Sequence, residues 1–458
     1  MKSEVNSLLT QEQEEIVKCS MKLKKEQILK VNAFAGTGKT TTLIEIAKAN
    51  KSLKFLYLAF NNSIVKAAKK SFPSNVDVVT LHSLAYRYLK GKPKIRNNDY
   101  DALTLIEILN IEESKTYLAH DILKLFKFYC ISSKQNISDF QEHLIQFNDD
   151  VFFYAIKLWD LMLENNIEIT HDFYLKLFSL NNSAMNDLST RYDCFLLDEA
   201  QDSNEVTLAM FKNLNGKKIL VGDKYQQIYQ FRGSVNAMEK VVADYDYFLT
   251  FTFRCSHSVV EKANEVLKKY LMSEKLLISK QSGQMSKNNK VAYIARTNAT
   301  LIELIDTFKD EPQGFYLTRN ANEIFNTAIN LYYFLNNEFK KISKEFAFLK
   351  KFISEDDLLD YIEDNDLIEL KTNMKIAKRY KGYLFVLKKE AEEKSNIYSN
   401  IVMTTAHACK GLEWDRVVIM KDFKDLELVD EDKLFEEANL LYVAITRAKY
   451  YVDFLSDE

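Results

Sequence analysis

The sequence predicts an α/β fold with two parallel sheets, each interrupted by a mainly helical insertion. Short apolar runs alternate with helical segments near the N-terminus, as in a doubly wound sheet. Similar runs return twice after long helical stretches. Glycine and proline are scarce, at 10 and 3 of 458 residues, which favours long helices and short connections.

The first 84 residues carry the alternation most clearly. The predicted helices are Gln11–Lys18, Thr40–Ala49 and Asn62–Lys70, and the strand-like runs are Ile28–Ala35, Phe55–Ala59 and Val76–Leu81. Because the second and third helices each separate two strands, these connections are crossovers and the strands should be parallel.

Interruptions of this alternation define the predicted domains. Residues 85–188 read as a helical insertion, after which strand-like runs return at Cys194–Leu197 and Lys218–Val221. The first domain is therefore placed at 1–84 plus 189–245. The second is placed at 246–319 plus 397–458, with a smaller, charged helical insertion at 320–396.

Composition excludes several classes of protein. A hydrophobic fraction of 47% excludes a disordered chain. A net charge of −3 excludes a cationic coat, so any nucleic acid must bind in a local groove. Five cysteines without a CxxC pair argue against a disulfide framework and a structural zinc site. With no signal-peptide or membrane-span pattern, we expect a cytoplasmic protein of a bacterium or phage (nuclear in a eukaryote) and no membrane partner.

A glycine-containing loop follows the first strand and opens a helix. Gly36 and Gly38 would let backbone N–H groups surround phosphate oxygens, while Lys39 would reach the β- and γ-phosphates and Thr40 would bind Mg²⁺. The first glycine of the usual motif is replaced by Ala33. The alternative is an ordinary strand-to-helix turn. The predicted nucleotide-binding loop comprises Ala35, Gly36, Thr37, Gly38, Lys39, Thr40 and Thr41.

Two carboxylates follow the apolar run at 194–197. Asp198 would bind Mg²⁺, and Glu199 would orient and deprotonate the attacking water. The carboxyl ends of parallel strands face the ligand crevice, which places both groups where a nucleotide would bind. Alone, such a pair could also be a solvated strand end or a helix N-cap.

Further motifs make the pattern specific. They are Leu220-Val-Gly-Asp-Lys-Tyr-Gln226-Gln-Ile-Tyr229-Gln-Phe231-Arg232-Gly233, Thr405-Ala-His407-Ala-Cys-Lys-Gly-Leu-Glu413-Trp-Asp415 and Leu441-Tyr-Val-Ala-Ile-Thr-Arg447-Ala448. With the phosphate loop and acidic pair, they resemble the UvrD/Rep/PcrA group of superfamily 1A DNA helicases. Leu58-Ala-Phe60-Asn-Asn-Ser63 resembles the F-box DNA helicase branch.

That resemblance implies two RecA-like P-loop NTPase domains, with ATP and Mg²⁺ between them and single-stranded DNA across them. By position in the motifs, Gln13 would read adenine, Phe253 would stack on it and Glu413 would approach the ribose. Gln226 would sense the γ-phosphate. Arg254 and Arg447 would bind phosphate and stabilise the charge that develops during phosphoryl transfer. An isolated arginine would more simply form a surface ion pair. Arg447, however, follows an apolar Tyr-Val-Ala-Ile run that reads as a strand, which places it at a predicted strand-to-helix junction.

The predicted DNA track lies just past strand ends. Aromatic faces stack on bases of any sequence, and basic groups follow phosphates. Thr80-Leu-His82 and Thr405-Ala-His407 share a spacing that suits equivalent positions on two related domains. For any one member, the alternative is a packed core side chain. The DNA-binding candidates are Phe60, His82, Tyr229, Phe231, Arg232 and His407, whereas the other four histidines are read as structural.

The resemblance implies a 3′-to-5′ helicase acting on single-stranded DNA and on junctions with duplex, in repair or recombination. The insertion at 320–396 is smaller than usual for the family, which leaves a second hypothesis open. In this second hypothesis the chain is a DNA-stimulated ATPase that unwinds DNA only together with a partner, such as a nuclease or repair factor in recombination or phage defence. The partner would bind 320–396 or 85–188, although 320–396 could simply cover the second domain. A catalytically dead scaffold conflicts with the intact Lys39, Asp198, Glu199, Gln226, Arg254 and Arg447.

Overall fold

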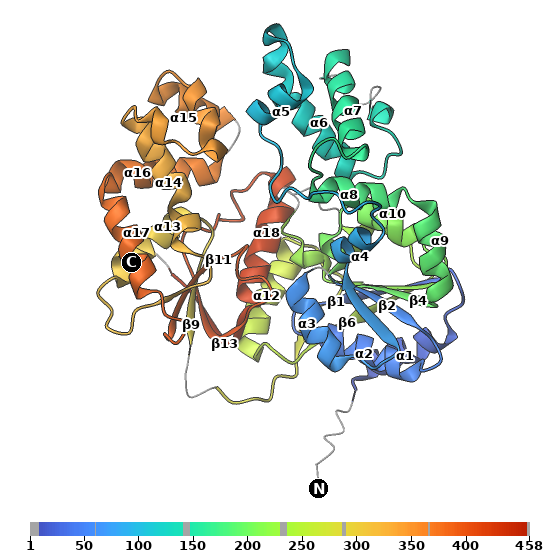
Figure 1. Cartoon of the computed structure of the whole chain (residues 1–458). Coiled ribbons are helices and arrows are strands. Elements are labelled where there is room, and N and C mark those ends of the chain that lie inside the picture. The colour runs from blue at the N-terminus through green and yellow to red at the C-terminus, as the bar shows by residue number, and fades with distance from the viewer. Residues whose placement is uncertain are drawn as a thin grey trace. The chain divides into compact units, whose positions relative to one another are not determined.

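The computed structural model describes residues 9–59, 61–140, 147–229, 236–285, 290–364 and 367–455. The chain divides into two compact units. One comprises 1–34 and 38–249, and the other comprises 35–37 and 250–458. Each contains its own parallel sheet with helices around it (Figure 1). No helix among the described residues is both long and apolar enough to cross a membrane.

The first unit is built on a six-stranded sheet in the order β3-β2-β4-β5-β1-β6, with every pairing parallel. Its central strands are almost entirely buried, which explains their continuous apolar runs. The strands are β1 (Ile28–Ala33), β2 (Phe55–Ala59), β3 (Val76–Thr80), β4 (Cys194–Leu197), β5 (Lys217–Gly222) and β6 (Tyr245–Leu249).

Helices cover both faces of this sheet and bury two separate cores. One face packs against α1 (Gln11–Lys22), α2 (Lys39–Ala49) and α3 (Asn62–Ser71). The other packs against α4 (Leu81–Arg87), α10 (Glu205–Asn213), α11 (Ala237–Lys240) and the first insertion. The doubly wound architecture predicted from the alternation is therefore present.

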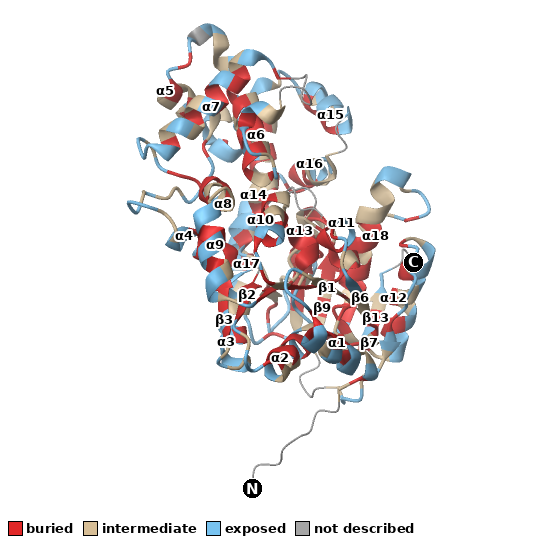
Figure 2. Cartoon of the chain, turned by 90° about the vertical axis from the view of Figure 1, so that its right-hand side faces the viewer, coloured by how far each residue is buried: buried red, intermediate tan, exposed pale blue. Residues whose placement is uncertain are grey.

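The first insertion shares its core with the sheet. Its helices are α5 (Ala102–Leu109), α6 (Ala119–Ile131), α7 (Asp149–Leu163), α8 (His171–Ser179) and α9 (Asn182–Arg191). Side-chain N-caps start four of them, at Asp101, Asn148, Thr170 and Asn181. Figure 2 shows buried and exposed residues alternating along these helices, as expected for amphipathic helices.

The second unit contains a five-stranded parallel sheet in the order β10-β11-β9-β12-β13. Its strands are β9 (Val291–Ala295), β10 (Tyr316–Leu317), β11 (Ile401–Thr405), β12 (Trp414–Ile419) and β13 (Ala448–Phe454). A separate pair, β7 (Phe251–Thr252) and β8 (Ile278–Ser279), precedes it. Helices α12 (His257–Lys269) and α18 (Glu431–Ile445) pack on each other and on β13.

The second insertion has two roles in packing. Its helices α14 (Ala321–Leu335), α16 (Ile368–Tyr380) and α17 (Tyr383–Lys394) join α13 (Asn298–Phe308) in the core against the sheet. With the 3₁₀ helices η6 (Phe339–Lys341) and η7 (Lys344–Lys351) and α15 (Glu355–Asp364), parts of α14 and α16 also form a second small core. The predicted helical character of 320–396 is confirmed.

Two sequence predictions need correction. Residues 246–249 belong to the first sheet, because β6 pairs with β1 throughout Tyr245–Leu249, so the boundary at 246 was several residues early. The apolar run before Arg447 is the last turn of α18 and not the predicted strand. Arg447 therefore lies at a helix-to-strand junction. An apolar run of four residues does not distinguish a buried helix from a strand. All five cysteines are free thiols, as expected.

Candidate nucleotide-binding site

The topology of the first sheet brings three motifs together. Strands β4, β5 and β1 are consecutive neighbours and run in the same direction, so their carboxyl ends share one edge. The phosphate-loop segment follows β1, the acidic pair follows β4 and Asp223 follows β5. The three segments therefore lie at the same edge of the sheet.

The loop after β1 has the backbone conformation that its glycines allow. Gly36 and Gly38 have φ of 70° and 82°, in the left-handed region where a Cβ would introduce strain. Gly38 is the N-cap of α2, and Lys39 is the first helical residue. Thr40 and Thr41 are exposed in the first turn, where Thr40 could approach a bound ion. A helix N-terminus behind a glycine loop favours anions.

Lys39 lies in a strongly negative environment. Its Nζ is 3.2 Å from Oε2 of Glu199. Burial opposes the charged ammonium, but the carboxylates of Glu199, Asp198 and Asp223 outweigh that effect and raise the pKa of Lys39. The lysine therefore stays protonated and can bind phosphate oxygens.

Asp198 is held by a residue that the sequence did not single out. The Tyr57 hydroxyl, from the neighbouring strand β2, donates a hydrogen bond to Oδ2 of Asp198. The other oxygen, Oδ1, accepts the backbone N–H of Glu199 at 2.9 Å. Burial, then repulsion from Glu199, raise the pKa of Asp198 to about 6. Tyr57 gave no signal because every residue of β2 is buried and apolar in pattern.

A second missed residue connects the two acidic segments. Gln201, in the 3₁₀ helix η3 (Ala200–Asp202), donates from Nε2 to Oε2 of Glu199 at 2.6 Å. Its Oε1 accepts the backbone N–H of Asp223 at 3.1 Å. Asp223 in turn accepts from the Gln226 side chain at 2.8 Å. The predicted γ-phosphate sensor Gln226 is thus linked to the predicted base Glu199 by a continuous chain of contacts.

Gln13 is buried at the start of α1, with 3% of its surface exposed. Its Oε1 accepts the Thr10 backbone N–H at 3.0 Å, and its Nε2 donates to the Thr42 hydroxyl at 3.2 Å. These bonds orient the amide beside α2. Its proposed contact with adenine stays a prediction.

The second unit gathers the other predicted phosphate-binding groups. Arg254 donates to Glu413 at 2.8 Å and to the Thr446 carbonyl at 3.3 Å. Glu413 also pairs with Lys449 at 2.9 Å, a partner that the sequence analysis missed. Although burial opposes its charge, these cations lower the pKa of Glu413. Phe253, the predicted adenine-stacking residue, has 46% of its surface exposed.

Arg447 is almost fully buried, with 1% of its surface exposed. It donates to the Val443 carbonyl at 2.9 Å and to the Thr446 hydroxyl at 3.2 Å. Burial, then the nearby guanidinium of Arg254, lower the pKa of Arg447. Both effects disfavour the charged guanidinium, so an anion bound beside Arg447 would stabilise it.

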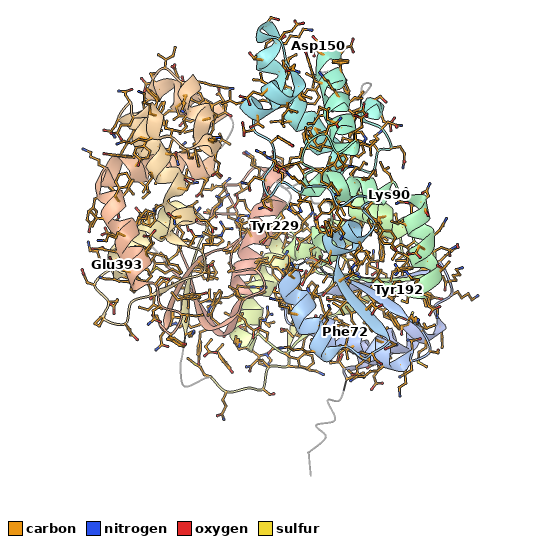
Figure 3. All side chains as sticks on the ribbon, in the orientation of Figure 1. Phe72, Lys90, Asp150, Tyr192, Tyr229 and Glu393 are labelled. Carbon is orange, nitrogen blue, oxygen red and sulfur yellow. The ribbon has the colours of Figure 1, made fainter. Side chains whose placement is uncertain are left out.

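Two members of the DNA track line one cavity. His82 and Tyr229 lie on the wall of a cavity of about 330 Å³ that also touches Asp198. His82 packs edge-on against Tyr174 and His171 of α8, and burial and His171 lower its pKa. His171, read from the sequence as structural, is therefore a neighbour of the track. Tyr229 is labelled in Figure 3.

The remaining track residues are placed differently. His407 follows β11 in the second unit and is half-buried. Phe60, Phe231 and Arg232 lie outside the described residues.

The donor set of the first unit suits Mg²⁺. Three carboxylates act on one ammonium, so the cluster keeps a negative excess, and the pKa of Asp198 is raised in part by Glu199. A divalent cation would offset the negative excess and the repulsion between Asp198 and Glu199. Magnesium in phosphate-binding sites takes one or two carboxylates and completes its shell with phosphate and water. Asp198 would hold the ion together with Thr40, the residue that directly follows Lys39.

Comparisons with known proteins point in one direction. A family model of the UvrD/REP helicase N-terminal domain matches residues 9–246, and one of the UvrD-like helicase C-terminal domain matches residues 139–454. F-box DNA helicase 1 of Gallus gallus is 26% identical, over 96% of this chain and 48% of its own length.

Two further relatives extend this picture. F-box DNA helicase protein 1 of Schizosaccharomyces pombe is 28% identical over 96% of this chain and 56% of its own length. A probable DNA helicase II homolog of Mycoplasma genitalium is 24% identical over 92% of this chain and 82% of its own length. The chain spans about half the length of the two F-box helicases that it matches.

Proposed function

Because the chain belongs to the UvrD/REP helicase family, we propose that it is an ATP-driven DNA helicase that translocates on single-stranded DNA in the 3′-to-5′ direction. Its two sheet units correspond to the family's two RecA-like domains, each with a helical insertion. The observation that carries the proposal is the cluster of Lys39, Asp198 and Glu199 beside the phosphate loop.

Each residue of the cluster has a defined task. Lys39 binds the β- and γ-phosphates as a permanent cation. Asp198 holds Mg²⁺, which when bound neutralises phosphate charge. Glu199 is oriented by Lys39 and Gln201 and accepts a proton from the attacking water.

The second unit supplies the remaining charge. We assign Arg254 and Arg447 to phosphate oxygens that become more negative in the transition state. Burial and the Arg254 charge both lower the pKa of Arg447, and an anion bound beside the two guanidiniums would offset both effects. Glu413 holds Arg254 in place and, with Phe253, faces the nucleoside.

The first experiment is ATP-dependent strand displacement on duplexes with a 3′ or a 5′ single-stranded tail. Displacement only from the 3′ tail is the expected result. DNA-dependent ATP consumption without displacement from either tail would favour the partner-dependent ATPase, with the partner at 320–396 or 85–188. The cytosolic location also stays a prediction.

The phosphate-loop assignment has a matched control. Lys39→Ala should lower ATP turnover at least about 100-fold, the scale of losing one transition-state charge contact. Lys48→Ala, on the same helix, removes an exposed lysine paired with Glu45 at 2.7 Å and should keep full turnover. Equal turnover in the two variants would refute the site. Phe231→Ala should keep basal turnover but reduce its stimulation by DNA.

A further inference from the structure

Strand β2 contains a buried polar group that has no assigned task in ATP hydrolysis. Tyr57 is the polar member of an otherwise apolar strand, and none of its surface is exposed. A tyrosine hydroxyl buried this deeply normally finds a hydrogen-bond partner. Here the partner is the carboxylate of Asp198, which follows the neighbouring strand β4. The contact therefore joins a core residue to the proposed magnesium ligand.

The register of the sheet explains why Tyr57 reaches Asp198. Tyr57 lies directly opposite Leu196 of β4. Side chains on a strand alternate between the two faces, so Asp198, two residues after Leu196, shares a face with Tyr57. The ladder continues to that point, since the Asp198 N–H donates to the Leu58 carbonyl at 3.4 Å. A tyrosine side chain that lies along the strand can therefore end at the Asp198 carboxylate.

Packing fixes the position of the Tyr57 ring. The ring of Phe72, the residue that ends α3, lies 5.0 Å from it, centroid to centroid, and is labelled in Figure 3. Tyr57 also shares a core with Leu43 and Ile46 of α2, the helix that begins at the phosphate loop. Side chains in a close-packed core have little freedom to move, so the fold sets the position of the hydroxyl.

Two hydrogen bonds fix the plane of the Asp198 carboxylate. Oδ2 accepts from the Tyr57 hydroxyl, and Oδ1 accepts from the Glu199 backbone N–H at 2.9 Å. Among the described residues, Tyr57 is the one side chain that donates a hydrogen bond to Asp198. With the Glu199 bond alone, the carboxylate could rotate toward Lys39, whose charge acts on it. Each oxygen of the fixed carboxylate still has a lone pair to offer to an ion.

We propose that Tyr57 is a positioning residue for the magnesium ion, because its hydroxyl holds the Asp198 carboxylate in the orientation that binds the metal. This inference rests on the proposed function, in which Asp198 is the magnesium ligand. Carboxylate ligands of metals are held by such outer hydrogen bonds, and losing one typically lowers metal affinity about 10- to 100-fold. The effect concerns metal binding and leaves the phosphate contact of Lys39 in place.

A pair of tyrosine variants provides a matched test. Tyr57→Phe removes the hydroxyl and keeps the ring that packs against Phe72. Tyr129→Phe is the control, because Tyr129 of the first insertion is also buried and its hydroxyl donates to the Gln135 carbonyl at 2.8 Å. Both variants lose one buried hydrogen bond, so their melting transitions should fall by similar amounts. Only Tyr57→Phe should change metal binding.

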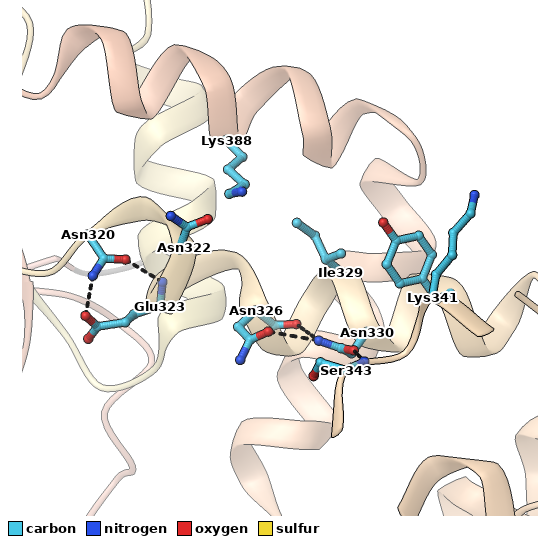
Figure 4. Close-up of a pocket in the computed structure, with 10 residues that line it drawn as sticks. Asn320, Asn322, Glu323, Asn326, Ile329, Asn330, Lys341, Ser343 and Lys388 are labelled. Atoms are coloured by element: carbon cyan, nitrogen blue, oxygen red, sulfur yellow. Dashed lines mark hydrogen bonds between the residues drawn. The ribbon is translucent and has the colours of Figure 1, made fainter. Parts of the chain in front are cut away.

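A second control addresses metal bound to other carboxylates. Glu323 of α14 lines a polar pocket of about 480 Å³ and accepts a hydrogen bond from Asn320 (Figure 4). Like Asp198, it is a carboxylate held by a neighbouring side chain, but it lies in the second unit, whereas Asp198 belongs to the first. Glu323→Gln should therefore leave the metal affinity of the nucleotide site unchanged.

The first measurement is binding of Mn²⁺, which takes oxygen ligands as Mg²⁺ does, to the ADP-bound protein by electron paramagnetic resonance. At about pH 8 the Asp198 carboxyl is ionised, because its pKa is about 6. Tyr57→Phe should weaken Mn²⁺ binding at least about tenfold, while Tyr129→Phe and Glu323→Gln match the unaltered chain. In steady-state ATPase assays, the half-saturating Mg²⁺ concentration of Tyr57→Phe should rise about tenfold, with kcat at saturating Mg²⁺ within about threefold.

Two outcomes would overturn the proposal. One is a Mn²⁺ affinity of Tyr57→Phe equal to that of the unaltered chain, whatever happens to kcat. The other is an equal loss in Tyr57→Phe and Tyr129→Phe, because stability alone would then explain it. Failure of the proposed function has a different signature. In that case Asp198→Asn would keep the Mn²⁺ affinity of the unaltered chain, or ATP turnover would survive Lys39→Ala.

Discussion

Gln201 offers the sharpest test of the catalytic geometry, because one buried amide holds two segments of the site. It donates to Glu199 at 2.6 Å and accepts from the Asp223 backbone at 3.1 Å, and none of its surface is exposed. Gln201→Met keeps the length and shape of the side chain but removes both hydrogen bonds.

The expected cost follows from those two bonds. A hydrogen bond to a carboxylate is worth about 1.5–3 kcal/mol, and a buried N–H that loses its partner costs about 1–3 kcal/mol. Because the two share one side chain, we expect about 3 kcal/mol of lost unfolding free energy in the first unit. At about 2–4 °C per kcal/mol for a unit of this size, its melting transition should fall by roughly 6–12 °C.

The catalytic consequence is separable from the loss of stability. Glu199 loses one of the contacts that orient it, so kcat should fall about 10- to 100-fold below the melting range. The KM for ATP should change less than about threefold, because Lys39 still binds phosphate. Steady-state ATPase assays and differential scanning calorimetry measure the two effects.

A surface pair provides the control. Gln11 on α1 donates to Glu15 at 3.0 Å in an exposed contact, and Gln11→Met should change stability by less than about 0.5 kcal/mol. Gly222→Ala is an independent perturbation, because a Cβ at 222 would clash with Oε1 of Gln201. If Gln201→Met matched Gln11→Met in both stability and kcat, the link from Gln201 to Glu199 would have no catalytic role.

Three further predictions address other parts of the site. Burial and Glu199 raise the pKa of Asp198 to about 6, so its carboxylate takes up a proton as pH falls through 6. Because a protonated carboxyl binds Mg²⁺ poorly, the Mg²⁺ concentration required for half-maximal turnover should rise about tenfold per pH unit below that value. Asp198→Asn should abolish this dependence, and a flat profile in the unaltered chain would contradict the assignment. Glu413→Gln should lower kcat about tenfold, because Arg254 loses its ion pair with Glu413. The variant should lose less than about 1 kcal/mol of unfolding free energy, since the Glu413 side chain is 41% exposed. Unchanged turnover would argue against a role for Arg254. Phe253→Ala should raise the KM for ATP about tenfold without changing the melting transition, and Phe253→Tyr should restore it; equal KM values in the two variants would remove Phe253 from the adenine site.

Local patterns in the chain were sufficient to predict much of the proposed ATP site. Gly36, Gly38 and Lys39 form a motif whose backbone and charge requirements are met within a few residues, so sequence alone reveals it. Asp198 and Glu199 were recognisable because parallel strands present their carboxyl ends to ligands. The order of strands β4, β5 and β1, which the sequence did not predict, brings these motifs to one edge of the sheet.

The sequence also determined the α/β class, the two insertions and most strand positions, because these depend on apolar periodicity over short windows. Tertiary packing decided the rest. Tyr57 and Gln201 reach the site through contacts with residues far away in the chain, and nothing in their own neighbourhoods distinguishes them from core residues. Strand β6 joined the first sheet because β1 offered an unpaired edge, and the run before Arg447 became a helix because it packs against α12. Hydrogen-bond partners and sheet edges are long-range properties, and only the folded chain specifies them.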